Sequence, residues 1–170
     1  VLKGGVVLDR LNASSIVAFD KTGTLTLGEL EVDEIVPLTA SNRPMDEVIF
    51  AAAALEKNAT HPIAKAIYKK CEGHAPYPAK EIKVIPGTGV EGVVTIGSTY
   101  FPSFIGDPGS RVDPSILEKK QEEGKITALF RLGDESYLFS FLDHPRPRVA
   151  EMLQRLKSRG KRLLMITGDN

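Results

Sequence analysis

The 170-residue sequence is poor in the features that mark several specialised protein classes. Cys71 is the only cysteine and the three histidines are widely spaced, so neither a disulfide framework nor a zinc cluster is available, and a reducing, cytosolic setting fits best. No apolar run approaches the roughly 20 residues that cross a bilayer. Lys plus Arg and Asp plus Glu each total 22, without the basic excess typical of nucleic-acid binding. We therefore expect no nucleic-acid partner, and an anionic ligand must be held locally.

The rest of the composition is that of a globular chain. Hydrophobic residues make up 42% and charged residues 26% of it, which suffices for one or two domains with a buried core. The sequence starts at Val1 without a methionine or a signal-peptide pattern, and it stops at Asn170 soon after an apolar run that predicts a strand. We expect a piece of a longer protein whose fold is interrupted at both ends.

Two segments far apart in the sequence predict parts of one α/β layer. Residues 15–19 form a short continuous apolar run, which is typical of a strand buried on both faces of a parallel sheet. Apolar residues at helical spacing over 149–156 predict a helix that leads into a strand over 163–166. The long stretch between them is then an insertion, and we place the boundaries at 1–27, 28–142 and 143–170.

The predicted insertion, residues 28–142, has the pattern of an α+β domain with a mostly antiparallel sheet. Its apolar residues alternate between helical spacing and short runs bounded by Gly, Pro or Asp. We predict helices over 45–57, 62–70 and 114–123, and strands over 82–85, 90–96, 127–132 and 137–141.

The carboxylate of Asp20 follows the first predicted strand directly, at the edge where open α/β sheets bind their ligands. The next residues, KTGT, supply hydroxyls, a flexible glycine and successive backbone N–H groups suited to a phosphoryl group. A carboxylate placed there can attack the γ-phosphorus of a nucleotide. The alternative is an Asp that caps a turn after a strand, which is the commoner role for an arbitrary Asp-Lys-Thr-Gly.

Three segments resemble P-type ATPases, in the order that family has them. Residues 20–26, DKTGTLT, resemble the phosphorylation signature, residues 143–146, DHPR, resemble the hinge motif, and residues 167–169, TGD, resemble the second phosphate-binding segment. The resemblance implies that Asp20 takes the γ-phosphate. Its other implied site residues are Lys21 and Thr24, which neutralise or hydrogen-bond the phosphate; Thr167, Gly168 and Asp169 of the second segment; and, as Mg²⁺ ligands, the Asp20 carboxylate and the Thr22 carbonyl.

Two further segments resemble the heavy-metal-transporting branch. His61-Pro62 with Glu56 upstream looks like its nucleotide-site dipeptide, and the 87–89 segment looks like its glycine motif. The imidazole could stack on or hydrogen-bond to adenine, while Glu56 could accept from the exocyclic amine. Alone, His61 at a helix start would more often be a cap. Gly87 and Gly89 precede a strand, which predicts a tight hairpin that comes close to ribose or phosphate, or else turn glycines without a ligand.

Thr22 separates this sequence from the phosphatases of the haloacid-dehalogenase-like fold. Those enzymes usually carry a second Asp two residues after the nucleophile as general acid/base, and Thr22 occupies that position here. Water attack on an aspartyl phosphate should then be slow. A phosphatase remains the alternative reading of the same fold.

The resemblance implies a partial haloacid-dehalogenase-like Rossmannoid phosphorylation domain (1–27 and 143–170) with an inserted α+β nucleotide-binding domain (28–142). It implies ATP and Mg²⁺ as cofactors, and a heavy-metal cation bound elsewhere in a parent that also holds transmembrane and actuator domains. The chain would lie on the cytosolic or stromal side. The family's G-D-G-x-N-D segment is not in the sequence, so we expect ATP binding without turnover, and a purely nucleotide-binding module is the second alternative.

Overall fold

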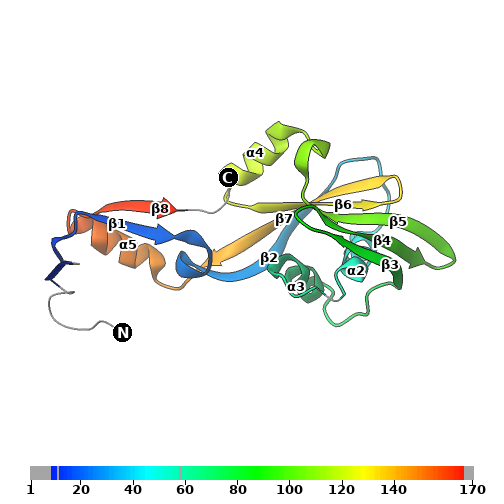
Figure 1. Cartoon of the computed structure of the whole chain (residues 1–170), viewed down its shortest axis with the longest axis horizontal. Helices are drawn as coiled ribbons and strands as arrows, with labels where there is room; N and C mark the ends of the chain where they lie inside the picture. The colour runs from blue at the N-terminus through cyan, green and yellow to red at the C-terminus, as the bar shows by residue number, and fades with distance from the viewer. Residues whose placement is uncertain (1–8, 11, 58, 167–170) are drawn as a thin grey trace. The chain divides into compact units, whose positions relative to one another are not determined.

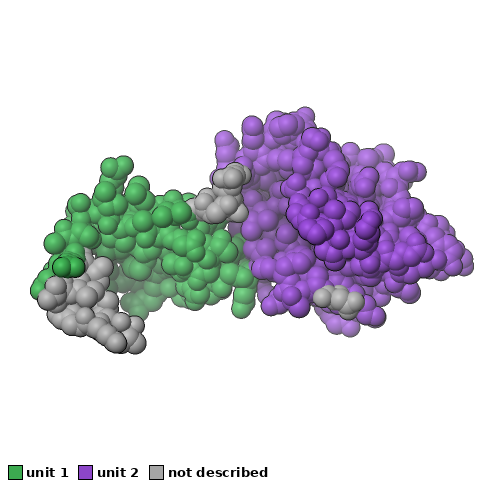
Figure 2. All heavy atoms as spheres, in the orientation of Figure 1, with its two compact units in different colours: residues 1–29, 143–170 green, residues 30–142 purple. Residues whose placement is uncertain are grey.

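The computed structural model describes residues 9–10, 12–57 and 59–166, and the chain divides into two compact units. Unit 1 consists of residues 1–29 and 143–170, and unit 2 of residues 30–142 (Figure 2). Within the described ranges, no helix is long and apolar enough to cross a membrane.

Unit 1 is built on two parallel strands from opposite ends of the sequence. Strand β1 (Ile16–Asp20) pairs in parallel with β8 (Arg162–Ile166), and the register aligns Asp20 with Ile166. A short turn, η1 (Lys21–Leu25), follows β1, and helix α5 (Val149–Ser158) precedes β8 (Figure 1). The parallel pair and its helix confirm the predicted α/β layer.

The prediction that β1 is buried on both faces is wrong for the part of the chain that the structure describes. Ile16 is 47% exposed on β1, and Met165 is 61% exposed on β8. Among the described residues, β1 pairs only with β8, and apolar side chains on both strands stay open.

Unit 2 contains a six-stranded sheet in the order β2-β7-β6-β5-β4-β3 (Figure 1). Successive strands from β3 to β7 pair antiparallel, which confirms the predicted type of sheet. The outer strand β2 and its neighbour β7 also continue into unit 1. The strands are β2 (Thr26–Pro37), β3 (Ala79–Ile85), β4 (Gly89–Ile96), β5 (Thr99–Gly106), β6 (Ile126–Leu132) and β7 (Glu135–Pro145).

Two helices pack on one face of this sheet and one on the other (Figure 1). Helices α2 (Met45–Leu55) and α3 (Pro62–Lys70) bury their apolar residues in the main core. The small turn η2 (Gly109–Arg111) and helix α4 (Pro114–Glu122) belong to the opposite side, where Val112 packs with apolar residues of β6 and β7.

The main core of unit 2 is aromatic on the sheet and alanine-rich on the helix. Phe130, Tyr137, Phe139 and Phe141 are fully buried, and neighbouring rings lie 6.0–6.2 Å apart. Helix α2 contributes four consecutive buried alanines, residues 51–54. Small side chains allow a helix backbone to lie close to the sheet, so the end of α2 is held in a fixed place.

A charged group at one end of the core is fully paired. The Arg43 guanidinium donates to Glu135 Oε1 at 2.8 Å and to Glu47 at 3.1 Å. The Tyr137 hydroxyl also donates to Glu135, and its oxygen lies 2.7 Å from Ser41 Oγ. The hydrogen bond from Arg43 is the main reason that the pKa of Glu135 is lowered to about 2.

Candidate functional site

The Asp20 carboxylate ends β1 on an exposed edge of unit 1. The following turn is helical only in part, because Thr22 has an extended conformation and Gly23 a left-handed one with φ 75°. A side chain at Gly23 would meet no atom, so glycine is required there for its φ angle and not for space. The turn therefore places a carboxylate next to a short run of backbone N–H groups.

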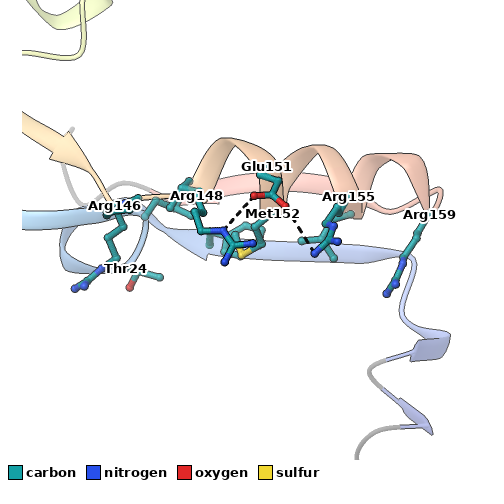
Figure 3. Close-up of a pocket in the computed structure, with 12 residues that line it drawn as sticks. Thr24, Arg146, Arg148, Glu151, Met152, Arg155 and Arg159 are labelled. Carbon is teal, nitrogen blue, oxygen red and sulfur yellow. Dashed lines mark hydrogen bonds and ion pairs between the residues drawn. The ribbon is translucent and has the colours of Figure 1, made fainter.

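Lys21 and Thr24 both follow Asp20 in the sequence and differ in exposure. Lys21 is half-buried, whereas Thr24 is exposed and lines a groove of about 670 Å³ within unit 1. Its lining includes the apolar side chain of Met152 and four arginines, which lie in a row along α5 and the segment before it (Figure 3). These arginines are Arg146, Arg148, Arg155 and Arg159, and Glu151 contacts two of them, Arg148 and Arg155. The surroundings of Thr24 are thus cationic.

The second predicted phosphate-binding segment, Thr167, Gly168 and Asp169, lies outside the described residues. The strand that leads to it is described, and its last residue, Ile166, is in register with Asp20. The chain thus reaches the level of the carboxylate at Ile166.

The predicted hinge residue Asp143 lies next to the turn after β1. Its Oδ2 accepts a hydrogen bond from the Thr26 hydroxyl at 2.6 Å, and its Oδ1 accepts from the Gly28 N–H at 3.0 Å. Arg146 donates from its guanidinium to the Gly23 carbonyl at 2.9 Å. Sequence reasoning assigned no role to Thr26 beyond the motif, and no local pattern links it to a residue 117 positions away.

Glu56 and His61 are brought together by the end of α2 and the start of α3. Their Oε2 and Nε2 atoms lie 3.1 Å apart, although the alignment leaves Oε2 without a hydrogen bond in the described part of the chain. His61 also caps α3, since its Nδ1 accepts from the Ala64 N–H at 3.4 Å. The helix-cap reading of His61 is therefore correct, and the side chain is still 48% exposed.

The environment of Glu56 differs from that of a surface acceptor. The residue is 2% exposed. Burial raises the pKa of the Glu56 carboxyl above its usual range, and the neighbouring His61 opposes this shift. Because Glu56 lies against the imidazole, it is placed to orient His61.

Gly87 and Gly89 lie on the turn between β3 and β4, which is the predicted hairpin. Their roles differ. A Cβ at Gly89 would lie 2.2 Å from the Ile105 carbonyl oxygen, whereas a Cβ at Gly87 would meet nothing within 4 Å. Gly89 is therefore glycine because of the neighbouring strand, and Gly87 because of its φ of 71°.

Gly106 and Asp107 lie against the turn that carries Gly87 and Gly89, and we call these four residues the corner. The sequence did not predict the part that Gly106 and Asp107 play in it. Gly106 pairs with Gly89 in the sheet, and the Asp107 N–H donates to the Thr88 carbonyl at 2.7 Å. The available signal was a glycine at the end of an apolar run, residues 104–106, but Pro102 obscured the strand before it.

The residues at and after Asp20 offer oxygen atoms, which are the ligands that Mg²⁺ prefers. No group of three His, Cys, Asp or Glu side chains among the described residues could hold a metal by itself. Mg²⁺ usually takes one or two carboxylates and completes its shell with water and substrate phosphates. The exposed Asp20 carboxylate is a ligand of the kind that such a partial site uses, and Thr22, the other predicted ligand, is exposed two residues further along the turn.

Known proteins resemble this chain over nearly its whole length. A family model of haloacid dehalogenase-like hydrolases matches residues 15–170. The copper-exporting P-type ATPase B of Archaeoglobus fulgidus is 36% identical over 167 residues, which cover 95% of this chain and 24% of the relative. The cadmium-transporting ATPase of Staphylococcus aureus is 35% identical over 192 residues, which cover 100% of this chain and 25% of the relative. The chain thus spans about a quarter of these relatives.

Solved structures lead to the same group of proteins. A crystal structure of a zinc-transporting PIB-type ATPase in its E2·Pi state matches with a TM-score of 0.77 and 29% identity, covering 100% of this chain and 28% of that one. The catalytic domain of the CPx-ATPase CopB-B, described with its conformational changes on nucleotide binding, matches with a TM-score of 0.67 and 26% identity, covering 100% of this chain and 60% of that one. The chain therefore belongs to the haloacid dehalogenase-like hydrolases and, within them, matches the catalytic region of heavy-metal P-type ATPases.

Proposed function

We propose that the chain is the ATP-binding and phosphorylation-site region of a P-type heavy-metal pump, which couples ATP hydrolysis to cation transport. The observation that carries this proposal is the place of Asp20, an exposed carboxylate at the end of β1 followed by a turn of backbone N–H groups. The names of the relatives, which are copper- and cadmium-transporting ATPases, support it.

In the proposed reaction, an Asp20 carboxylate oxygen attacks the γ-phosphorus of ATP. A new O–P bond forms as the bond between the γ-phosphorus and the β,γ-bridging oxygen breaks, and ADP leaves with that electron pair. Lys21 and Thr24 would neutralise or hydrogen-bond the transferred group, and Thr167, Gly168 and Asp169 would hold its oxygens from the second strand. Mg²⁺, bound by Asp20 and the Thr22 carbonyl, would supply charge neutralisation.

Thr22 favours a pump over a phosphatase within this family. A second carboxylate two residues after the nucleophile would activate water, and a threonine cannot act as such a base. An aspartyl phosphate on Asp20 would then persist long enough to drive a change of conformation. Hydrolysis of small phosphomonoesters by the chain, lost in Asp20→Asn, would support the phosphatase instead.

The nucleotide would be held in unit 2 by His61, Glu56 and the corner at Gly87 and Gly89. Both imidazole nitrogens of His61 already face protein partners, Ala64 N–H and Glu56, so its exposed part is ring face and edge. We infer that it stacks on the base, a contact worth about 1–3 kcal/mol. Glu56 would orient the ring.

The test of Asp20 is phosphate incorporation from ATP labelled in the γ-position, measured in the full-length protein. We expect acid-stable, hydroxylamine-sensitive label in the wild type and none in Asp20→Asn. Retention of the label in that variant would refute Asp20 as the acceptor.

The test of the nucleotide site is calorimetric titration of the 170-residue chain with ATP. We expect His61→Ala to weaken binding about tenfold or more, in line with the loss of a stacking contact, and Asp20→Asn to leave it unchanged. An absence of adenine-nucleotide binding would refute the site. The same proposal extends to the whole protein. It would bind a heavy-metal cation outside this chain, contain transmembrane and actuator domains, and hold this chain on the cytosolic or stromal side of the membrane.

A further inference from the structure

The Thr26 hydroxyl is a junction between two parts of unit 1. Thr26 is 7% exposed, and its Oγ1 accepts from the Gly23 N–H at 3.1 Å. The same oxygen lies 2.6 Å from Asp143 Oδ2 and 3.1 Å from the Lys21 carbonyl. A hydroxyl has only one proton to donate. The Asp143 carboxylate is closer and is a stronger acceptor than the Lys21 carbonyl, so Thr26 donates to Asp143 while it accepts from the Gly23 N–H.

Arg146 holds the carbonyl group of the same residue, Gly23. Its Nη2 donates to the Gly23 carbonyl at 2.9 Å, and its own N–H donates to the Leu25 carbonyl at 2.9 Å. Gly23 is thus fixed at both its N–H and its C=O, although glycine, which has no Cβ, is intrinsically the most adaptable residue of the turn. Figure 3 shows Arg146 beside Thr24, at the turn.

The same residues tie together the two segments by which the chain passes between the units. Strand β2 begins at Thr26 and continues into unit 2, and β7 returns from unit 2 and ends at Pro145. Asp143 joins them, since its two oxygens accept from Thr26 and from the Gly28 N–H. A displacement of either segment therefore acts on Gly23.

We propose that Asp143 and Arg146 are positioning residues for the phosphoryl-accepting turn, acting on Gly23 through Thr26 and through the Gly23 carbonyl. The inference deepens the proposed function, since it takes Asp20 as the acceptor. Asp20 is three residues before Gly23. In the proposed reaction, the N–H groups between them would donate to the transferred group. Holding both peptide groups of Gly23 restricts the backbone of the turn next to Asp20, so a movement of β2 or β7 would change the readiness of Asp20 to react.

We call the hydrogen bonds that Thr26, Asp143 and Arg146 make around Gly23 the clamp. Amide hydrogen exchange of the 170-residue chain tests the clamp without any catalysis. We expect Thr26→Val to speed exchange at Gly23 by several-fold, because it removes the hydroxyl that accepts from the Gly23 N–H, and Asp143→Asn to act in the same direction, because it weakens the bond that holds this hydroxyl in place. Arg146→Ala should also speed it. Thr26→Ser, which keeps the hydroxyl, should restore slow exchange.

Two matched variants and an internal reference control this measurement. Arg148→Ala removes a neighbouring exposed arginine, Asp134→Asn removes an exposed carboxylate, and both should leave Gly23 exchange unchanged. The amide of Phe139, in the core of unit 2, should keep its protection in every variant. Unchanged exchange at Gly23 in Asp143→Asn, or an equal acceleration at Phe139, would overturn the proposal.

A kinetic split separates positioning from simple stability. In the full-length protein, Thr26→Val and Arg146→Ala should slow phosphate incorporation on Asp20 by about tenfold with no change in ATP affinity, and Thr26→Ser should restore the rate. An equal loss in Arg148→Ala would count against the clamp. If the wild type incorporates no phosphate on Asp20, the proposed function fails, whereas the exchange result still decides whether the clamp holds the turn.

Discussion

The two units differ in how completely their secondary structure is covered. In unit 2, six strands and three helices enclose a core in which Phe130, Tyr137, Phe139 and Phe141 are fully buried. In unit 1, the described strands are the parallel pair β1 and β8 together with the ends of β2 and β7, and Leu164 and Met165 on β8 are 42% and 61% exposed. The proposed base-binding pair thus lies on a packed scaffold, while the proposed phosphoryl acceptor lies on an open one, held locally by side-chain hydrogen bonds.

The largest expected effect is the removal of a core ring from unit 2. Phe139→Ala should lower the free energy of unfolding by about 3–5 kcal/mol, because it leaves a cavity among buried rings. The matched change in unit 1, Leu164→Ala, should cost less than about 1 kcal/mol, because that side chain is already 42% exposed.

Far-ultraviolet circular dichroism in a urea titration reports on both units and can measure this difference. Tyrosine fluorescence then identifies the transition of unit 2, since all four tyrosines, Tyr68, Tyr77, Tyr100 and Tyr137, belong to that unit. Equal losses from Phe139→Ala and Leu164→Ala would contradict the contrast between the units.

The next effect separates the two glycines of the nucleotide corner. Gly89→Ala should destabilise the chain by about 3 kcal/mol and abolish ATP binding, because its Cβ would overlap the Ile105 carbonyl oxygen at 2.2 Å. Gly87→Ala should cost only about 1 kcal/mol, since its Cβ has open space and only the φ angle is unfavourable. Thermal unfolding and ATP titration of the two variants check this order, and a reversed order would refute it.

A smaller effect concerns the paired charge at the edge of the core. The pKa of Glu135 is lowered to about 2, mainly by its hydrogen bond from Arg43. Its contribution to the free energy of unfolding is therefore present above the ordinary carboxyl pKa near 4.5 and is lost as the pH falls toward 2. Arg43→Met should lower stability at pH 7 by about 1 kcal/mol and have little effect near pH 2. Unfolding at the two pH values measures it, with the exposed Arg159→Met as control. A loss of the same size at both pH values would contradict the assignment.

The smallest expected effect is on the pH dependence of the free energy of unfolding, to which Glu56 contributes. Burial raises the pKa of this carboxyl in the folded state, so the folded chain holds its proton more tightly than the unfolded chain does. Stability should therefore fall as the pH rises from about 4.5 through the folded-state pKa. Glu56→Gln should remove this part of the slope, which urea titrations between pH 4.5 and 7.5 can detect. The exposed Glu72→Gln is the control, and a slope unchanged in Glu56→Gln would rule the effect out.

The sequence predicted best where a local signal marks both ends of an element. Helix α3 has the predicted bounds, because Pro62 starts it and the apolar pattern ends at Lys70. Strands β2 and β5 were missed. Acidic residues interrupt the apolar pattern of β2, and Pro102 lies inside β5, where a proline argues against a central strand.

In the candidate site too, only residues with a local sequence signal could be predicted. Asp20 was evident because a strand and a motif meet at it. The contact between Glu56 and His61 depends on the path of the loop between two helices, and the bond between Thr26 and Asp143 joins residues 117 positions apart. Such contacts are set by tertiary packing, and no periodicity in the sequence encodes them.

The neighbouring positions of β2 and β7 in the sheet also bear on how this chain can be dissected. Unit 2 starts on one of these strands and ends on the other, so residues 30 and 142 belong to adjacent strands, which lie about 4.8 Å apart in a sheet. Unit 2 is thus one continuous stretch whose two ends lie on neighbouring strands, and the 3.0 Å hydrogen bond from the Gly28 N–H to Asp143 Oδ1 joins the chain where it leaves and re-enters unit 1. We expect a short glycine linker at this point to rejoin the remaining two segments, so that unit 2 can be exchanged as a cassette between related chains.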